Sequence, residues 1–435
     1  MSTTEPVLPG AELGQPPGPH GPPPATTPPP ETPRRPLTRL QQAAIALGTV
    51  SMGAGLSINV VVVAPLARDA GLTELQVAGI MTLSTLLFTV TIPWWGRVAD
   101  RFGRKRVMVF SLLMMAICNA AFIFALDAAL AGALAGTSAF LMLCFVRFWF
   151  GLLSPGLQPA SMAAMADATT AETRAAGMGL LGAGMSIGAI VGPASAAVLA
   201  RIDALLPIWA AVVFSLLVAG TIAFVLPPTR AQRSQATPPP PLSMRDPRIV
   251  PPFVFLLVYF TIVGGVQQTI AWLIKDRFLL DRADAVEAAG VVMAALGAAL
   301  IIVQFGYVGR TKPNPRRMLP QGLALIAAGY AITLLAGDFT LFCLGFALVG
   351  TGAGLCVPAM NALGTLAVEP HEQGAAASLM SAAPPGGYIL GPLVGAALYM
   401  VSPILPLAMS TVAISALLVY ALRGRLGRAR QLPAE

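Results

Sequence analysis

Apolar stretches of about twenty residues recur along the chain from Arg39 onward, separated by short polar connections. A stretch of about 20 apolar residues is the length that an α-helix needs to cross the hydrocarbon core of a bilayer. The pattern therefore predicts an all-α polytopic membrane protein with twelve transmembrane helices. The expected spans are residues 40–66, 76–96, 107–126, 138–162, 176–200 and 205–226, followed by 250–274, 287–308, 318–336, 340–362, 375–401 and 404–422.

The twelve stretches divide into two sets of six. We expect an N-terminal six-helix bundle over residues 39–226 and a C-terminal six-helix bundle over residues 250–423. The segment 227–249 is rich in proline and arginine, which predicts a cytoplasmic linker. Residues 1–38 are proline-rich and polar, so we expect a disordered cytoplasmic tail, and residues 424–435 form a second short tail.

An internal repeat relates the two sets at a constant offset of 199 residues. Gly151, Pro159, Gly188, Gly192 and Pro193 recur as Gly350, Pro358, Gly387, Gly391 and Pro392. One offset held over about fifty residues indicates a parallel duplication. The two bundles are therefore expected to be pseudo-symmetric and to enclose a site at their interface.

Composition and charge agree with a membrane protein. Hydrophobic residues make up 56% of the 435 residues and charged residues 11%, whereas soluble domains carry about 25%. The net charge of +8 does not indicate nucleic-acid binding, because the Lys and Arg residues flank apolar stretches instead of forming a basic face. With both termini in the cytoplasm, 21 of the 27 Lys and Arg residues fall on the inner side, as cytoplasmic loops require.

Metal, cofactor and enzyme chemistry are not expected. The four cysteines lie inside apolar stretches, and no pair has the spacing of metal ligands. The spans also contain no cluster of His, Cys or carboxylate residues of the kind that an active site needs.

The polar loop after the second span carries the most specific motif, Gly96-Arg-Val-Ala-Asp100-Arg101-Phe-Gly103-Arg104-Lys-Arg. This loop resembles the signature of the major facilitator superfamily at every defining position, and the superfamily's topology matches the chain from about Arg39. In that family the aspartate reaches the cytoplasmic start of the eleventh span, which here lies near Gly374. The resemblance implies a conformational switch formed by Gly96, Asp100, Arg101, Gly103 and Arg104.

Arg147 is the one ionisable residue placed clearly within a span, where a charge costs about 2.5–3.5 kcal/mol on insertion scales. Arg147 and Gly151 resemble the family's fourth-span motif, which is linked there to proton transfer or substrate contact. The resemblance implies a coupling or substrate role, and the alternative is a structural arginine bonded to backbone carbonyls.

The fifth span contains Gly179, Gly188, Gly192 and Pro193 at the spacing that resembles the signature of the family's antiporters. The signature ends in two glycines where this chain has Ala196-Ala197. Small residues at intervals of four allow helices to approach closely, and proline bends them. The second-half repeat, Gly387, Gly391 and Pro392, is expected to pack in the same way.

Family topology assigns the first, fourth, seventh and tenth spans to the wall of a substrate cavity. The polar and aromatic residues expected there, besides Arg147, are Asn59, Tyr259, Gln267, Gln268 and Trp272. An apolar wall with few hydrogen-bonding groups suits a bulky amphiphilic molecule better than a sugar. For Asn59, Gln267 and Gln268 an interhelical hydrogen bond is an equally good interpretation.

These observations favour an exporter in a bacterial inner membrane, with both termini cytoplasmic. It would move small amphiphilic compounds, such as a drug-like molecule, a siderophore or a metabolite, by alternating access with proton antiport. Its partners would be a small-molecule substrate, protons and the lipid bilayer, and the chain would act as a monomer. The alternative is a proton-coupled or uncoupled importer of a small organic metabolite. The spans offer no carboxylate at mid-membrane depth, so proton coupling is implied by the resemblance alone.

Overall fold

The computed structural model describes residues 37–169, 174–227, 243, 245–311, 313–369 and 372–423. Residues 1–36 of the expected tail at 1–38, most of the linker at 227–249 and the tail at 424–435 lie outside the described residues.

Helices account for nearly all of the described residues, and no strand occurs among them. The first half contains α1 (Arg39–Asp69), α2 (Glu74–Phe102), α3 (Arg104–Leu130), α4 (Thr137–Leu153), α5 (Leu157–Ala168), α6 (Arg174–Leu199) and α7 (Leu206–Val225). The second half contains α8 (Val250–Phe278), α9 (Arg282–Ile301), the π-helix η1 (Ile302–Val308), α10 (Gly309–Thr311), α11 (Pro315–Leu335), α12 (Phe339–Thr365), α13 (Gln373–Met380), α14 (Ala383–Val401) and α15 (Leu405–Leu422).

Eleven of the helical segments are long and apolar enough to cross a membrane, with α4 and α5 counted as one segment. The remaining predicted span, 375–401, is divided into α13 and α14 by a turn at Ser381 and Ala382. The sequence of α14 explains this break, because Pro384 and Pro385 favour the first turn of a new helix over the interior of a long one. With α13 and α14 counted together, the structure agrees with the predicted twelve-helix class.

Local sequence signals set where the helices begin. Thr38 and Thr73 each form a capping box with the glutamine three residues later, which satisfies two free backbone donors at the start of α1 and of α2. Asp281 and Asp338 cap α9 and α12 with their side-chain oxygens. Gly103 separates α2 from α3 with φ of 94°, a conformation that glycine adopts without steric cost.

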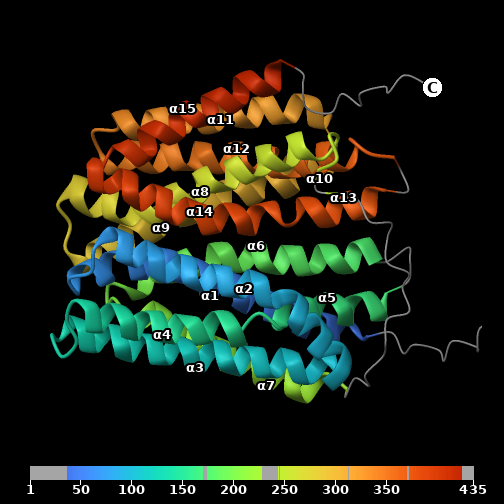
Figure 1. The fold of residues 1–435 in the computed structure, drawn as a ribbon, viewed down its shortest axis with the longest axis horizontal. Helices are drawn as coiled ribbons and strands as arrows, with labels where there is room; N and C mark the ends of the chain where they lie inside the picture. The colour runs from blue at the N-terminus through green and yellow to red at the C-terminus, as the bar shows by residue number, and fades with distance from the viewer. Residues whose placement is uncertain are drawn as a thin grey trace, which may run out of the picture. The chain divides into compact units, whose positions relative to one another are not determined.

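The two halves pack on one another through a few helices. Within each half the closest pairs include α1 with α6 and α8 with α14, and between the halves α6 lies against α9 and α2 against α14. Figure 1 shows the first half in blue to green and the second half in yellow to red. α1 also lies against α8 and α9, so the boundary between the halves is formed by α1, α2 and α6 on one side and α8, α9 and α14 on the other.

Candidate functional site: the cavity between the two halves

The helices run back and forth, so the structure has two ends. We call the end that contains the Gly103 turn the loop end, and the end where α1 and α8 finish, at Asp69 and Phe278, the ion-pair end. The short elements at the loop end pack on helices of their own half: α5 on α2 and α3, and α13 on α12 and α8. The ion-pair end is different, because charged side chains bridge the halves there.

Arg68 and Asp276 form the central bridge at the ion-pair end. The Nη1 atom of Arg68 lies 2.8 Å from each oxygen of Asp276, and the hydroxyl of Tyr399 donates to the same carboxylate at 2.6 Å. Arg68 also lies 3.3 Å from Glu74 at the start of α2. Both partners of the bridge are about two-thirds buried, so water screens this pair less than a fully exposed one.

Further contacts close the same end. Lys275 pairs with Asp69, and Arg201 after α6 pairs with Glu287 on α9. The indole Nε1 of Trp272 donates to the backbone oxygen of Ala64 at 2.7 Å. These bonds join α8 and α9 of the second half to α1 and α6 of the first, so the structure is closed at the ion-pair end.

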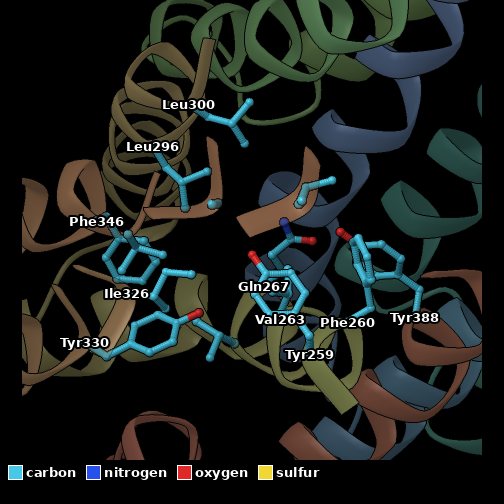
Figure 2. A pocket seen from close by; sticks show the side chains of 14 residues that line it. Tyr259, Phe260, Val263, Gln267, Leu296, Leu300, Ile326, Tyr330, Phe346 and Tyr388 are labelled. Carbon is cyan, nitrogen blue, oxygen red and sulfur yellow. The ribbon is translucent and has the colours of Figure 1, made fainter. Parts of the chain in front are cut away.

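The first of two neighbouring hollows lies inside the second half, and we call it the aromatic pocket. Its volume is about 110 Å³, and five helices contribute to its wall: α8, α9, α11, α12 and α14. Its rings are those of Tyr259, Phe260, Tyr330, Phe346 and Tyr388. Figure 2 shows Tyr330 and Phe346 on one side of the hollow, and Tyr259, Phe260 and Tyr388 with Gln267 on the other.

The second hollow lies between the halves, and we call it the interface cavity. Its volume is about 240 Å³, and α1 and α6 face α8, α9 and α14 across it. Gln267, Leu296, Leu300 and Tyr388 line both hollows, so the two adjoin. Gln267 of α8 and Tyr388 of α14 are the polar residues at this junction.

The walls of both hollows carry no Asp, Glu, Lys, Arg or His side chain among the residues that the structure describes. Their polar groups are three tyrosine hydroxyls, one carboxamide and the hydroxyls of Ser57 and Ser186. The described part of the chain also holds no group of three or more His, Cys, Asp or Glu residues that could bind a metal. The chemistry on offer is apolar and aromatic contact with a few neutral hydrogen bonds.

Two of the five cavity residues chosen from the sequence line these hollows. Tyr259 faces the aromatic pocket and Gln267 faces both hollows. Asn59, Gln268 and Trp272 are buried and line neither. Trp272 instead belongs to the closed ion-pair end, through its bond to the backbone of α1.

Arg147 lies inside the first half, with only 2% of its surface exposed. Its Nη2 donates to Asn59 Oδ1 at 2.5 Å, and its guanidinium carbon lies 3.9 Å from the ring centre of Phe122 and 5.3 Å from that of Phe150. Its Nε has no hydrogen-bond partner among the described residues. The structure thus brings two predicted site residues, Arg147 and Asn59, together, but away from both hollows.

The charged residues of the loop motif are bonded within the first half. Arg104 lies 3.4 Å from Asp100, pairs with Asp167 at the end of α5, and donates to the backbone oxygen of Ala163 at 3.2 Å. Arg101 is exposed and stacks on the ring of Phe102, whereas a methyl group at Gly96 would make only an ordinary contact with Pro159. The expected partner of Asp100, the helix start near Gly374, is α13, which packs on α12 and α8.

The glycines of the fifth-span motif join α6 to α1. A Cβ atom at Gly188 would lie 2.7 Å from the backbone nitrogen of Ala54, and one at Gly192 would lie 2.7 Å from its oxygen. Pro193 lines the interface cavity, while Gly179 has open space beside it. The motif therefore builds both a tight helix contact and part of the cavity wall.

The second-half repeat makes the matching contact between α14 and α8. A Cβ atom at Gly387 would lie 2.7 Å from the backbone of Phe260, and one at Gly391 would lie 2.6 Å from the oxygen of Thr261. Pro392 lies one residue further along α14 and is buried. The close packing predicted for Gly387, Gly391 and Pro392 places the neighbouring Tyr388 beside the cavity.

Sequence reasoning missed most of the wall. Tyr330, Phe346 and Tyr388 line the aromatic pocket, and Ser57 and Met293 line the interface cavity. A partial signal existed, because Tyr388 directly follows Gly387 of the repeated motif and Phe346 stands at the 199-residue offset from Arg147.

The sequence of the chain matches a known protein family and resembles proteins of known name. The family model described as Major Facilitator Superfamily matches residues 45–319 and 286–435. The chain is 24% identical to the class B tetracycline resistance protein of Escherichia coli over 333 residues, which cover 74% of this chain and 78% of that protein. It is 27% identical to multidrug resistance protein 2 of Bacillus subtilis over 323 residues, covering 71% of this chain and 76% of the relative.

Solved structures show the same fold. One is a bacterial homologue of the human lysosomal transporter Spinster in an inward-facing and occupied conformation, with a TM-score of 0.68 and 14% sequence identity. The match covers 90% of this chain and 98% of that one. At this identity the likeness concerns the fold alone.

Proposed function

Because this chain belongs to the Major Facilitator Superfamily, a family of transporters, we propose that it exports small amphiphilic compounds by alternating access, driven by proton antiport. The observation that carries the proposal is the interface cavity, which has an apolar wall with few neutral polar groups. Such a wall accepts apolar and aromatic surface and provides few of the convergent hydrogen bonds that a sugar would need. One chain contains both halves of the cavity, so a monomer is a sufficient transport unit.

The orientation follows from charge. The loop end carries the Lys- and Arg-rich segments, so we place it, with both termini, in the cytoplasm of a bacterial cell. The bridges at the ion-pair end would then close the cavity on the outer side, and we propose that the described state is inward-facing. Opening the outer side requires Arg68 and Asp276 to separate.

Asp100 supplies the opposite switch at the cytoplasmic end. In the described state it is bonded to Arg104 of its own half, and the described residues contain no ion pair between Asp100 and α13. In an outward-facing state we propose that Asp100 turns to the N-terminus of the helix near Gly374, where free N–H groups and the helix dipole favour an anion. Gly103 lies in the turn beside Asp100 and has φ of 94°. Glycine adopts positive and negative φ about equally readily, so the backbone of this turn can change between the two states.

Arg147 is proposed to act in coupling through α1 and not by touching the substrate. It bonds Asn59, whose chain neighbour Val60 lines the interface cavity, and the same helix carries Arg68 in its last turn. A shift of α1 around this bond would change the cavity wall and the outer bridge together.

The relatives support export over import. Two of the proteins that this chain resembles are named for tetracycline resistance and multidrug resistance, which are properties of exporters. The fifth-span residues Gly188, Gly192 and Pro193, which resemble an antiporter signature, lie in the helix contact and cavity wall where such a motif can act.

The test uses purified protein in liposomes with an imposed pH gradient and fluorescent amphiphilic dyes. We expect dye to move against its own gradient, in the direction opposite to the protons, and to stop moving when an ionophore collapses the gradient. Movement that ignores the gradient, or a protein that moves none of the dyes, would refute the proposal.

A further inference from the structure

The aromatic pocket of the second half stands where the first half holds Arg147. Arg147 precedes Gly151 by four residues on α4, and Phe346 precedes Gly350 by four residues on α12. The two glycines make equivalent contacts: a Cβ atom at Gly151 would lie 2.7 Å from a backbone oxygen of α2, and one at Gly350 would lie 2.8 Å from a backbone carbon of α9. In each half the glycine therefore packs against the second helix of that half, α2 or α9. Arg147 and Phe346, four residues before these glycines, occupy corresponding places.

The first half shows what this place in the fold can hold. A flat guanidinium lies there over the rings of Phe122 and Phe150, and its hydrogen bond goes to a neutral amide oxygen, Asn59 Oδ1. No carboxylate bonds it among the described residues. Aromatic faces attract cations strongly when both are removed from water. Rings and one amide oxygen are therefore sufficient to hold a delocalised cation at this place.

The second half places groups of the same kinds around the aromatic pocket. Phe346 replaces the arginine, and the rings of Tyr259, Tyr330 and Tyr388 surround the hollow with it. The carboxamide of Gln267 supplies a neutral oxygen, as Asn59 does in the first half. Figure 2 shows the hydroxyls of these tyrosines turned toward the hollow on whose wall Gln267 lies.

We propose that the aromatic pocket binds a flat, delocalised cationic group of the substrate, such as an amidinium or guanidinium, while the adjoining interface cavity holds the apolar remainder. This inference rests on the proposed function, because it specifies the substrate class of the same cavity. It also excludes carboxylates from the pocket, since no cation lines the wall to offset the cost of burying a negative charge.

The test compares three probes of the same shape: naphthalene-2-carboxamidine, which is a cation at pH 7, the uncharged carboxamide, and the carboxylate. Binding to the full-length protein in nanodiscs of zwitterionic lipid is measured by equilibrium dialysis, with empty nanodiscs as the blank. We expect the amidinium to bind at least tenfold more tightly than the amide, and the carboxylate not to bind. Equal binding of amidinium and amide would overturn the proposal.

Two variants locate the effect. Phe346→Leu keeps the pocket apolar but removes the ring, and should reduce the tenfold preference to less than threefold with little change for the amide. The matched control is Phe339→Leu at the start of the same helix, where the ring packs on Phe278 outside the pocket wall, and this variant should keep the preference. A preference that survives Phe346→Leu would contradict the assignment of the pocket.

Gln267→Glu provides an independent check should the first variant fold poorly. A carboxylate at this place should raise amidinium affinity about tenfold and leave the amide nearly unchanged, and an unchanged amidinium affinity would count against the pocket. Equilibrium dialysis measures binding without a pH gradient, so its result does not depend on whether the protein transports the probe. Gradient-driven export of uncharged dyes without a preference for the amidinium would remove only this inference.

Discussion

The guanidinium of Arg68 and the carboxylate of Asp276 meet at 2.8 Å across the boundary between the two halves, with the hydroxyl of Tyr399 on the same carboxylate at 2.6 Å. Arg68 has a second carboxylate, Glu74, within its own half. When the halves separate, Arg68 therefore keeps a charged partner within its own half, whereas Asp276 keeps the neutral hydroxyl of Tyr399. Opening of the ion-pair end therefore removes the charged partner of Asp276 but leaves Arg68 with Glu74.

Replacing Asp276 by Asn should weaken the closed state. Hydrogen bonds to charged groups contribute about 1.5–3 kcal/mol, and partial exposure places this one near the lower limit. The population open at the ion-pair end should thus rise roughly tenfold, since 1.4 kcal/mol is a factor of ten. Spin labels at positions 202 and 279, on opposite halves, would report longer distances by pulsed electron resonance.

The control for this experiment is Glu287→Gln. Glu287 pairs with Arg201, which is largely exposed, so loss of that pair should change the distances little. An Asp276→Asn protein with the same distance distribution as the wild type would show that the bridge does not hold the halves together.

Asp100→Asn should leave folding intact and reduce transport. The change removes the charge that is proposed to alternate between Arg104 and the helix start near Gly374. Transport by this variant in liposomes should fall severalfold at an unchanged unfolding temperature. Wild-type rates would refute a switching role for Asp100.

Gly103→Ala tests the same turn through its backbone. Gly103 has φ of 94° and ψ of 138°, a backbone conformation that is essentially restricted to glycine, and an alanine there is strained by about 1–3 kcal/mol. The unfolding temperature should fall by a few degrees. Gly179→Ala, at a glycine with open space beside it, is the matched control and should change stability little.

A double-mutant cycle measures the bond between Arg147 and Asn59. Asn59→Leu removes the acceptor and leaves a buried cation, which should cost about 3 kcal/mol. The combination with Arg147→Met should recover a large part of that cost, because no polar group then remains unpaired. Additive losses, measured by unfolding in detergent, would show that the two side chains do not interact.

A transport measurement on the Asn59→Leu/Arg147→Met variant distinguishes a coupling role of Arg147 from a structural one. We expect the double variant to be stable yet unable to couple substrate to the pH gradient. Normal coupled transport by this variant would leave Arg147 with a structural role only.

Asp246 gives a prediction on pH. Hydrogen bonds from the side chain and backbone of Arg248 hold the pKa of Asp246 below its ordinary value of 3.8, and Arg248 also bonds Glu372 before α13 at 2.8 Å. A lowered pKa adds stability above the ordinary pKa and loses it as the pH falls through the lowered one. Asp246→Asn should therefore lower the unfolding temperature at pH 7, and the difference from wild type should disappear in acid once the pH has fallen through the lowered pKa. Arg245→Gln, an exposed neighbour, should have no effect at either pH.

The sequence predicted the helix class and the pairing of the halves because membrane spans must be long and apolar, and because the repeated glycines need close backbone contacts. It predicted less of the site. Tyr259 and Gln267 of α8 line the cavity, whereas Trp272 of the same helix bonds the backbone of α1, and Asn59 of α1 bonds Arg147 of α4. Which side of a buried helix faces a cavity depends on tertiary packing, and an apolar span such as α8 has no polar side to reveal it.

The most direct test of the central claim follows protons while substrate moves downhill. Liposomes are loaded with substrate and a pH-sensitive dye, the membrane potential is clamped, and the substrate is then diluted outside. An antiporter predicts that the lumen acidifies as substrate leaves, and that Asp276→Asn changes the rate. A lumen that becomes alkaline would indicate symport, a constant pH would indicate uncoupled movement, and either result would contradict the account.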